Sequence, residues 1–383
     1  MDTFTRQWKN ITGNEPSLDA EQAQHRQTSL QLMSISPVDE VVDEMKNNPL
    51  SAHVQTNGCI ELADLLVCLF VEDRTQYSRI VQAILCAMRT HFDDVNVQQA
   101  ACLAFRRMTT SPRDRNTSNY EKSTVSKSAD VEMCKIILER GGIPQILVAV
   151  NNFSSSESVQ RYGLHVLHSV LSIPAVGALT VNVKHLMVEN RCIESAIRAM
   201  WAFPHCSDIQ EDGCLILWSL SYGSSCSQGA ILRHDGVPAI LHAMDLYQGN
   251  GNVQKFACGA LHTLSFEEDV CTCLLDNGGV NLLTAALQNH NNSKDFIEKS
   301  LTIIVNIAVA NEDSCVLDEM DILMIINILI LFMNSRDGGS IRKMGCFLLE
   351  TAGRAHANKS ILEDMEVRDV LAHALTQDLT VMN

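Results

Sequence analysis

Hydrophobic and polar positions along the chain follow the period of an amphipathic α-helix, and one such helix recurs. The clearest copy is "NVQKFACGALHTLSF", residues 252–266, whose apolar positions repeat about every 3.6 residues and form one stripe. Related copies begin at Val54, Val97, Val159, Ile209, Val253, Ile297 and Ile341. The pattern therefore predicts seven helices of one design, each with one buried side.

The spacing of these copies sets the length of the repeat. Successive starts are 43, 62, 50, 44, 44 and 44 residues apart, and a period near 44 is typical of repeats with two or three helices. The longest step contains residues 109–130, which are rich in Ser, Thr and charge, so a flexible insertion is expected there. We expect a repeat array over residues 37–383, preceded by a disordered or loosely capping arm over residues 1–36.

A second motif precedes most copies of the long helix. It reads "GGIPQILVAVNNF" from Gly141, "DGVPAILHAMDLY" from Asp235 and "GGVNLLTAALQNH" from Gly278. Gly142, Gly236 and Gly279 suit a left-handed residue that ends the preceding helix, and Pro144 and Pro238 suit the first turn of the next. A short apolar segment lies before each corner, so the expected unit is a short, a medium and a long helix.

Small residues and cysteines recur inside the long helix. Gly or Ala occupies one column, at Gly58, Ala101, Gly163, Gly213, Ala257 and Gly345, which predicts a close approach of another helix backbone. Cysteine occupies the next column, at Cys59, Cys102, Cys214, Cys258 and Cys346. Thiols placed by a repeat are expected to be small buried hydrophobic groups in a reduced protein. This predicts a cytoplasmic location, with the nucleus also possible.

The Gly-Gly-[Ile/Val]-Pro corner and the long helix with its Val-Gln, Gly/Ala and Cys columns together resemble armadillo repeats. The resemblance covers residue 37 to the C-terminus and implies an all-α, right-handed solenoid of about seven or eight three-helix repeats. Paired helices of the HEAT type are the alternative. The chain is also similar to armadillo segments that precede leucine-rich-repeat kinases.

Armadillo proteins commonly bind an extended peptide along a groove lined by their third helices. In nuclear-import adaptors of this family, a Trp and an Asn four residues later contact the peptide. Here the Trp column contains no Trp and the Asn column contains a single Asn, Asn306. The resemblance implies these candidate partner-binding residues: Asp64, Arg107, His165, Ser169, Ser219, Thr263, Asn306 and Thr351.

Charge and motif content narrow the function. The formal net charge of −16 disfavours nucleic acid or an anionic membrane as the main partner, and the run of apolar residues 322–333 is too short to span a bilayer. No phosphate loop, H-E-x-x-H, G-x-S-x-G or C-x-x-C motif occurs, and His165 and His168 lack further ligands at metal-binding spacing. We therefore expect no enzyme activity, no cofactor and no metal site.

These observations predict a non-catalytic scaffold or adaptor that binds a protein or peptide in an armadillo groove. The alternative is a regulatory subunit, or a detached armadillo domain, of a larger signalling enzyme. The sequence leaves the identity of the partner and the oligomeric state open.

Overall fold

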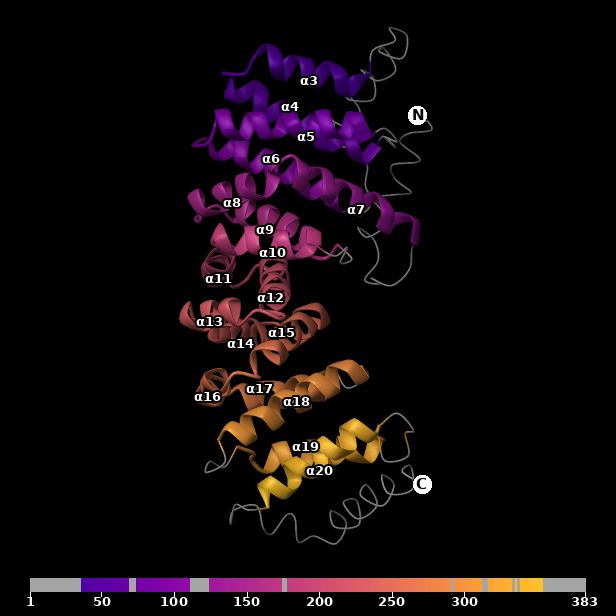
Figure 1. Ribbon diagram of the computed structural model, residues 1–383, viewed down its shortest axis with the longest axis vertical. Coiled ribbons are helices and arrows are strands. Elements are labelled where there is room, and N and C mark those ends of the chain that lie inside the picture. The colour runs from indigo at the N-terminus through magenta and orange to yellow at the C-terminus, as the bar shows by residue number, and fades with distance from the viewer. Residues whose placement is uncertain are drawn as a thin grey trace. The chain divides into compact units, whose positions relative to one another are not determined.

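The computed structural model describes residues 36–68, 74–110, 124–173, 178–290, 293–311, 316–332, 335 and 338–353. Within these ranges the chain forms eighteen α-helices and no strand (Figure 1). The expected arm over residues 1–36 lies outside the described residues except for Ser36. Residues 111–123 of the expected insertion also lie outside them, whereas its last part, from Thr124, belongs to a helix.

The chain divides into two compact units, Met1–Ala202 and Phe203–Asn383. The helices of unit 1 are α3 (Pro37–Asn47), α4 (Ala52–Cys68), α5 (Arg74–Thr90), α6 (Val95–Thr109), α7 (Thr124–Glu139), α8 (Gly142–Asn152), α9 (Glu157–Leu171), α10 (Ala178–Glu189) and α11 (Cys192–Ala202). Those of unit 2 are α12 (Ser207–Ser221), α13 (Ser225–Arg233), α14 (Gly236–Leu246), α15 (Gly251–Leu264), α16 (Glu268–Asp276), α17 (Gly279–Asn289), α18 (Lys294–Ala310), α19 (Glu319–Phe332) and α20 (Gly339–Ala352).

The seven predicted long helices are present as α4, α6, α9, α12, α15, α18 and α20. Side-chain caps fix the starts of several of them: Asp94 and Asn250, for example, accept hydrogen bonds from backbone N–H groups in the first turn of α6 and α15. The recurring Val lies three residues after this cap. In α18 the cap is Ser293, which puts Phe296 in the Val column, so the predicted start at Ile297 is wrong by one residue.

Four complete repeats of a short, a medium and a long helix lie within the described residues: α7–α9, α10–α12, α13–α15 and α16–α18. The α5–α6 repeat differs from the three-helix prediction. α5 has 17 residues, longer than the medium helices α8, α14 and α17, and α6 follows it directly. The described part of this repeat is therefore a helix pair, as in the HEAT-type alternative.

The Gly/Pro corners form where predicted, but the left-handed residue is one position earlier. Positive φ angles occur at Gly141, Asp235 and Gly278 rather than at the residues that follow them. Gly142 and Gly279 are instead the first residues of α8 and α17. A Cβ on Gly279 would lie 2.8 Å from the backbone oxygen of Leu274, so this second glycine allows the close approach of α17 to α16.

The small residues of the long helices make room for side chains rather than for a helix backbone, which corrects the prediction. A Cβ on Gly163 would lie 2.5 Å from Cγ2 of Val150 on α8. Met45 on α3 and Leu329 on α19 approach Gly58 and Gly345 in the same way. Each glycine thus receives an apolar side chain of the medium helix in its own repeat.

The recurring Gln explains why Val-Gln pairs mark the long helices. Gln98 is buried, and its Nε2 donates to the carbonyl oxygens of Met88 and His91, both at 2.8 Å. Carbonyl groups at the end of a helix lack a partner within that helix, and this amide supplies one while fixing the turn. The other buried glutamines that donate to the end of the medium helix are Gln55, Gln160, Gln210 and Gln254.

The last described repeat replaces this Gln with Arg342, whose Nη1 donates to the carbonyl oxygens of Phe332 and Ser335. In α18 the same column holds the buried Ile297, so its turn lacks this contact. The described turns between a medium and a long helix therefore share the glutamine contact, except for the turns before α18 and α20.

The core of each unit is aliphatic and contains the repeated thiols. Cys59, Cys102, Cys214 and Cys258 are buried as predicted, whereas Cys346 is partly exposed. The apolar helix α19 is less enclosed than expected, because Leu323, Ile330 and Leu331 are exposed.

Among the described residues no single helix has the length and apolar character to cross a membrane, although α16 and α17, bent by 79°, pass that test as a pair.

Candidate partner-binding face

The third helices of each unit pack against one another and form a ladder, whose outward side is the candidate binding face. In unit 1 the ladder runs through α4, α6 and α9, and in unit 2 through α12, α15, α18 and α20 (Figure 1). The apolar residue and the Gln near the start of most of these helices are buried, as at Val97 and Gln98, so the residues of the predicted groove columns lie on the less buried side. The two ladders carry different chemistry.

In unit 1 the ladder is held by charge. Arg107 on α6 forms an ion pair with Asp64 on α4. Both side chains are mostly buried, with 32% of the Arg107 side chain and 24% of the Asp64 side chain exposed. These two predicted site residues are thus brought into direct side-chain contact by the structure. They stabilise the ladder at the place where a partner was expected to bind.

Cations and an aromatic ring continue this ladder onto α9. The guanidinium groups of Arg106 and Arg161 lie 5.4 and 5.0 Å from the centre of the Tyr162 ring, within the range of cation–π attraction. His165 Nε2 lies 3.0 Å from Oγ1 of Thr110, and its ring is 5.6 Å from that of His168. Unit 1 therefore presents a polar face with several positive groups.

In unit 2 neutral hydrogen bonds replace the ion pair. Oγ of Ser221 on α12 lies 2.6 Å from Oγ1 of the buried Thr263 on α15. Asn306 on α18 donates from Nδ2 to Oγ of Ser265 at 3.0 Å. Two of the predicted residues thus connect neighbouring third helices.

The remaining predicted residues do not gather into one site. Ser169 and Thr351 donate to carbonyl oxygens one turn earlier in their own helices, at 2.8 and 2.9 Å. Ser219 is partly exposed on α12. The predicted residues therefore lie on the third helices that form the ladder, some stabilising it and some facing outward, and their contact with a partner stays a prediction.

Trp218 is the largest side chain on the ladder of unit 2. Its ring lies on the backbone of α15, since a Cβ on Gly259 would be 2.6–2.8 Å from three ring atoms. Nζ of Lys299, on α18, lies 5.0 Å from the ring centre and also pairs with Asp295 at 2.6 Å. Gly259 thus has a role that the sequence did not reveal, because it allows one indole to span three helices.

His262 lies beside this group. Partial burial, and then the nearby charge of Lys299, lowers the pKa of its imidazole, with Asp295 acting in the opposite direction. Its ring contacts Phe266 edge to face, with centres 5.4 Å apart. A neutral imidazole therefore belongs to the aromatic part of this ladder at neutral pH.

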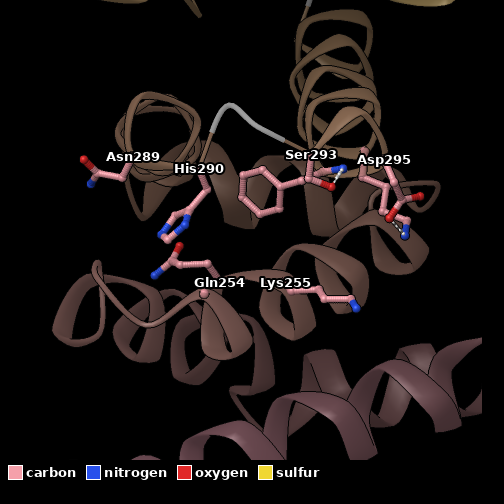
Figure 2. A pocket seen from close by; sticks show the side chains of 9 residues that line it. Gln254, Lys255, Asn289, His290, Ser293 and Asp295 are labelled. Carbon is pink, nitrogen blue, oxygen red and sulfur yellow. Dashed lines mark hydrogen bonds and ion pairs between the residues drawn. The ribbon is translucent and has the colours of Figure 1, made fainter. Parts of the chain in front are cut away.

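A pocket of about 290 Å³ lies at the amino ends of α15 and α18 (Figure 2). Its lining residues are Gly251, Gln254, Lys255, Asn289, His290, Ser293, Asp295, Phe296 and Lys299. His290 Nε2 lies 2.8 Å from the carbonyl oxygen of Gln248, and the His290 ring packs against Phe296 at 6.0 Å. Its size and mixed polarity suit one side chain of a partner.

The opposite, carboxyl ends of the same helices carry exposed apolar side chains that the sequence did not single out. Tyr222, Phe266 and Val309 occupy equivalent positions after α12, on the turn after α15 and near the end of α18, and all three are exposed. Equivalent positions in unit 1 hold Val67, Thr110 and Ser172, none of them aromatic. The signal that could have found them is an apolar residue three positions after the predicted Asn column, repeated in three consecutive repeats.

The repeated cysteines offer no reactive nucleophile to this face. Burial raises the pKa of the Cys59, Cys102, Cys214 and Cys258 thiols to about 12. A thiol with such a pKa stays protonated at neutral pH, and the thiolate is the reactive form. These cysteines act as core residues.

Comparisons with known proteins agree with this architecture. The family model described as the LRRK2 ARM repeat matches residues 17–181. A solved chain from the work "A conserved phosphorylation switch controls the interaction between cadherin and beta-catenin in vitro and in vivo" is similar, with a TM-score of 0.68 and 15% sequence identity. The likeness covers 88% of this chain and 56% of that one, so this chain spans little more than half of its structural relative.

At this identity the structural likeness shows the fold alone, and the matching family model adds the repeat type. Together with the Gly/Pro corners and the stacked third helices, they show that the chain has an armadillo-type fold and that residues 17–181 are similar to the LRRK2 ARM repeat.

Proposed function

We propose that the chain is a non-catalytic scaffold or adaptor that binds a segment of a protein partner across its third helices. The observation that carries this proposal is the ladder in each unit, which holds third helices side by side and leaves one row of side chains outward. The armadillo fold is typical of protein-interaction scaffolds. Fold alone does not define function, so the proposal is tied to this face.

The two faces of a repeat provide a direct test, because they carry apolar residues of nearly equal exposure. Ile60 on α4 and Phe347 on α20 are 40% and 38% exposed, and both belong to third helices. Val148 on α8 and Leu246 on α14 are 43% and 40% exposed and belong to medium helices. A photo-crosslinking amino acid at each position would sample the two faces under matched conditions.

The four labelled proteins would be irradiated in extracts of the cells that make the protein, and the adducts identified by mass spectrometry. We expect a shared partner to crosslink from Ile60 or Phe347 and not from Val148 or Leu246. Adducts only from the medium-helix positions would refute binding across the third helices. A catalytic turnover detected with the purified chain would refute the non-catalytic part.

A second candidate is a regulatory subunit, or the detached armadillo domain, of a larger signalling enzyme. The match of residues 17–181 to the LRRK2 ARM repeat model supports it. An enzyme that co-purifies in equal amounts, and whose rate changes when the chain is removed, is the expected result. An unchanged rate would refute this second candidate and would leave the scaffold as the one remaining proposal.

We also propose that the chain works in a reducing compartment, the cytoplasm or the nucleus. The buried, unpaired thiols of Cys59, Cys102, Cys214 and Cys258 support this, because they serve the core as thiols. Fluorescence microscopy of the tagged protein in its own cells would test it, and a secreted protein would contradict it.

A further inference from the structure

The carboxyl ends of the third helices in unit 2 form a row of exposed apolar side chains, here called the apolar row: Tyr222, Phe266 and Val309. They are 69%, 65% and 51% exposed. Single exposed hydrophobic residues are common on proteins and need no explanation. These three differ because they recur at one position in consecutive repeats, on helices that pack against one another.

Hydrogen bonds fix the spacing of the apolar row. The Ser221–Thr263 contact ties the residue before Tyr222 to α15, and the Asn306–Ser265 contact ties α18 to the residue before Phe266. The Cys271 thiol also donates to the Ser265 carbonyl oxygen at 3.0 Å. The three side chains are therefore held on a rigid edge, which lowers the entropy cost of binding.

The row continues inward as an aromatic surface. Trp218 precedes Tyr222 by one helical turn, and His262 precedes Phe266 by one turn, in edge-to-face contact with it. Aromatic side chains with one apolar face and a polar tip are enriched among residues that dominate binding energy. The equivalent positions in unit 1 hold no aromatic residue and include the polar Thr110 and Ser172, so the repeat itself does not require an aromatic row.

Acidic residues border the apolar row. Glu267, Glu268 and Asp269 directly follow Phe266 and are exposed. The carbonyl groups at the ends of α12, α15 and α18 add partial negative charge at the same edge. This surface is therefore complementary to a segment that carries both apolar and basic side chains.

We propose that the apolar row binds an extended peptide segment whose apolar residues cover Tyr222, Phe266 and Val309 and whose Lys or Arg residues face Glu267, Glu268 and Asp269. The inference rests on the proposed scaffold function. It adds the chemistry of the partner segment and the residues of the face that bind this segment. Apolar burial supplies the affinity, and the acids select basic segments and speed their association.

The test is a selection of random 16-residue peptides displayed on phage against the full chain, followed by binding measurements with synthetic copies of the enriched peptides. The test variant is Tyr222→Ser, Phe266→Ser, Val309→Ser. The matched control is Leu50→Ser, Phe92→Ser, Val148→Ser, three exposed apolar residues of unit 1. Circular dichroism and urea unfolding would confirm that both variants keep the fold.

We expect enriched peptides that combine two or more apolar residues with an excess of Lys and Arg. Their Kd should rise at least about tenfold with the test variant and stay within about twofold with the control. Peptides that bind the test variant as tightly as the parent would overturn the inference and leave the scaffold proposal intact. A selection that enriches no peptide would count against both.

The acidic border has its own readout. Glu267→Gln, Glu268→Gln, Asp269→Asn keeps the shape of the side chains and removes three negative charges. We expect a several-fold rise in Kd at low salt and a smaller dependence of Kd on ionic strength than in the parent. An unchanged salt dependence would show that these acids stabilise the amino end of α16 and do not contact the peptide. The proposed role of Lys and Arg in the partner would then be wrong.

Discussion

The ladders of the two units use the same helix and differ on its outward side. In unit 1 the Asp64–Arg107 ion pair and the Arg106–Tyr162 contact join successive third helices. In unit 2 the Ser221–Thr263 hydrogen bond does this, and Trp218 crosses α15 above Gly259. Val67, Thr110 and Ser172 of unit 1 occupy the positions that correspond to the apolar row of unit 2.

The buried side of the same helices hardly differs between the units. Gln98 in unit 1 and Gln254 in unit 2 donate to equivalent carbonyl oxygens, and Cys102 and Cys258 are equally buried. Repeat packing therefore constrains the inward half of each helix, while the outward half varies freely. Under the proposed function, the outward side is the part of the helix that would recognise a partner.

The shared core should give the largest effect, an alkaline loss of stability in both units. Burial raises the pKa of Cys102 and Cys258 from 9.0 to about 12. Between these values the unfolded chain loses protons that the folded chain keeps, so stability present below pH 9 falls as pH rises toward 12. Each thiol should cost about 1.4 kcal/mol at pH 10, so the two together lose more stability than either glutamine substitution described below. Urea unfolding from pH 8 to 11 measures this.

Cys102→Ala and Cys258→Ala provide the control. Each should lower stability at pH 8, because a buried side chain becomes smaller, and should flatten the alkaline slope by a similar amount. A slope that flattens for one variant and not for the other would break the claim that the two cores are equivalent.

The glutamine contacts should give the next largest effect. Gln98→Leu and Gln254→Leu each leave two carbonyl groups without their donor, so we expect a loss of about 2 kcal/mol in the free energy of unfolding in each case. Gln99→Leu is the control, because Gln99 is adjacent to Gln98 on α6 but only partly buried. Equal losses at Gln98 and Gln99 would show that the amide contact has no special role.

Periodicity was sufficient to predict most of the fold. Apolar stripes identified all seven long helices, because a helix that must stack on both neighbours repeats its buried positions strictly. The corner was displaced by one residue since sequence alone cannot tell which of two adjacent glycines has positive φ. At Asp235 the left-handed residue is not even a glycine.

The candidate site was less predictable. The column that contains Arg107 and Thr263 was identified as part of the ladder, but the pairing of these residues with Asp64 and Ser221 depends on the offset between neighbouring helices. That offset is set by packing at the glycine column and by the turns. Phe266 also lies outside the positions at which armadillo proteins contact peptides, because it follows the last turn of α15.

The two ladder contacts should respond differently to salt, with a smaller effect than the core. A double-mutant cycle with Asp64→Asn and Arg107→Gln should give a coupling of about 1 kcal/mol that shrinks in 1 M NaCl, because these partly exposed charges are screened. The cycle with Ser221→Ala and Thr263→Val should give a similar value without salt dependence. Identical salt responses would remove the distinction between the two ladders.

The smallest effect on stability, and the most local, should come from Gly259→Ala. The new Cβ would overlap the indole of Trp218, which is partly exposed and can shift toward solvent, so the helix-forming gain of Ala offsets part of the strain. In a background with Trp8→Phe and Trp201→Phe, we expect a red-shifted emission and stronger acrylamide quenching, with stability changed by only about 0.5 kcal/mol. Gly251→Ala in the same helix is the control, since its Cβ would meet no atom closer than 4.0 Å. Unchanged emission from Gly259→Ala would mean that the ring does not depend on this glycine, and unit 2 would lose the feature that most distinguishes its ladder.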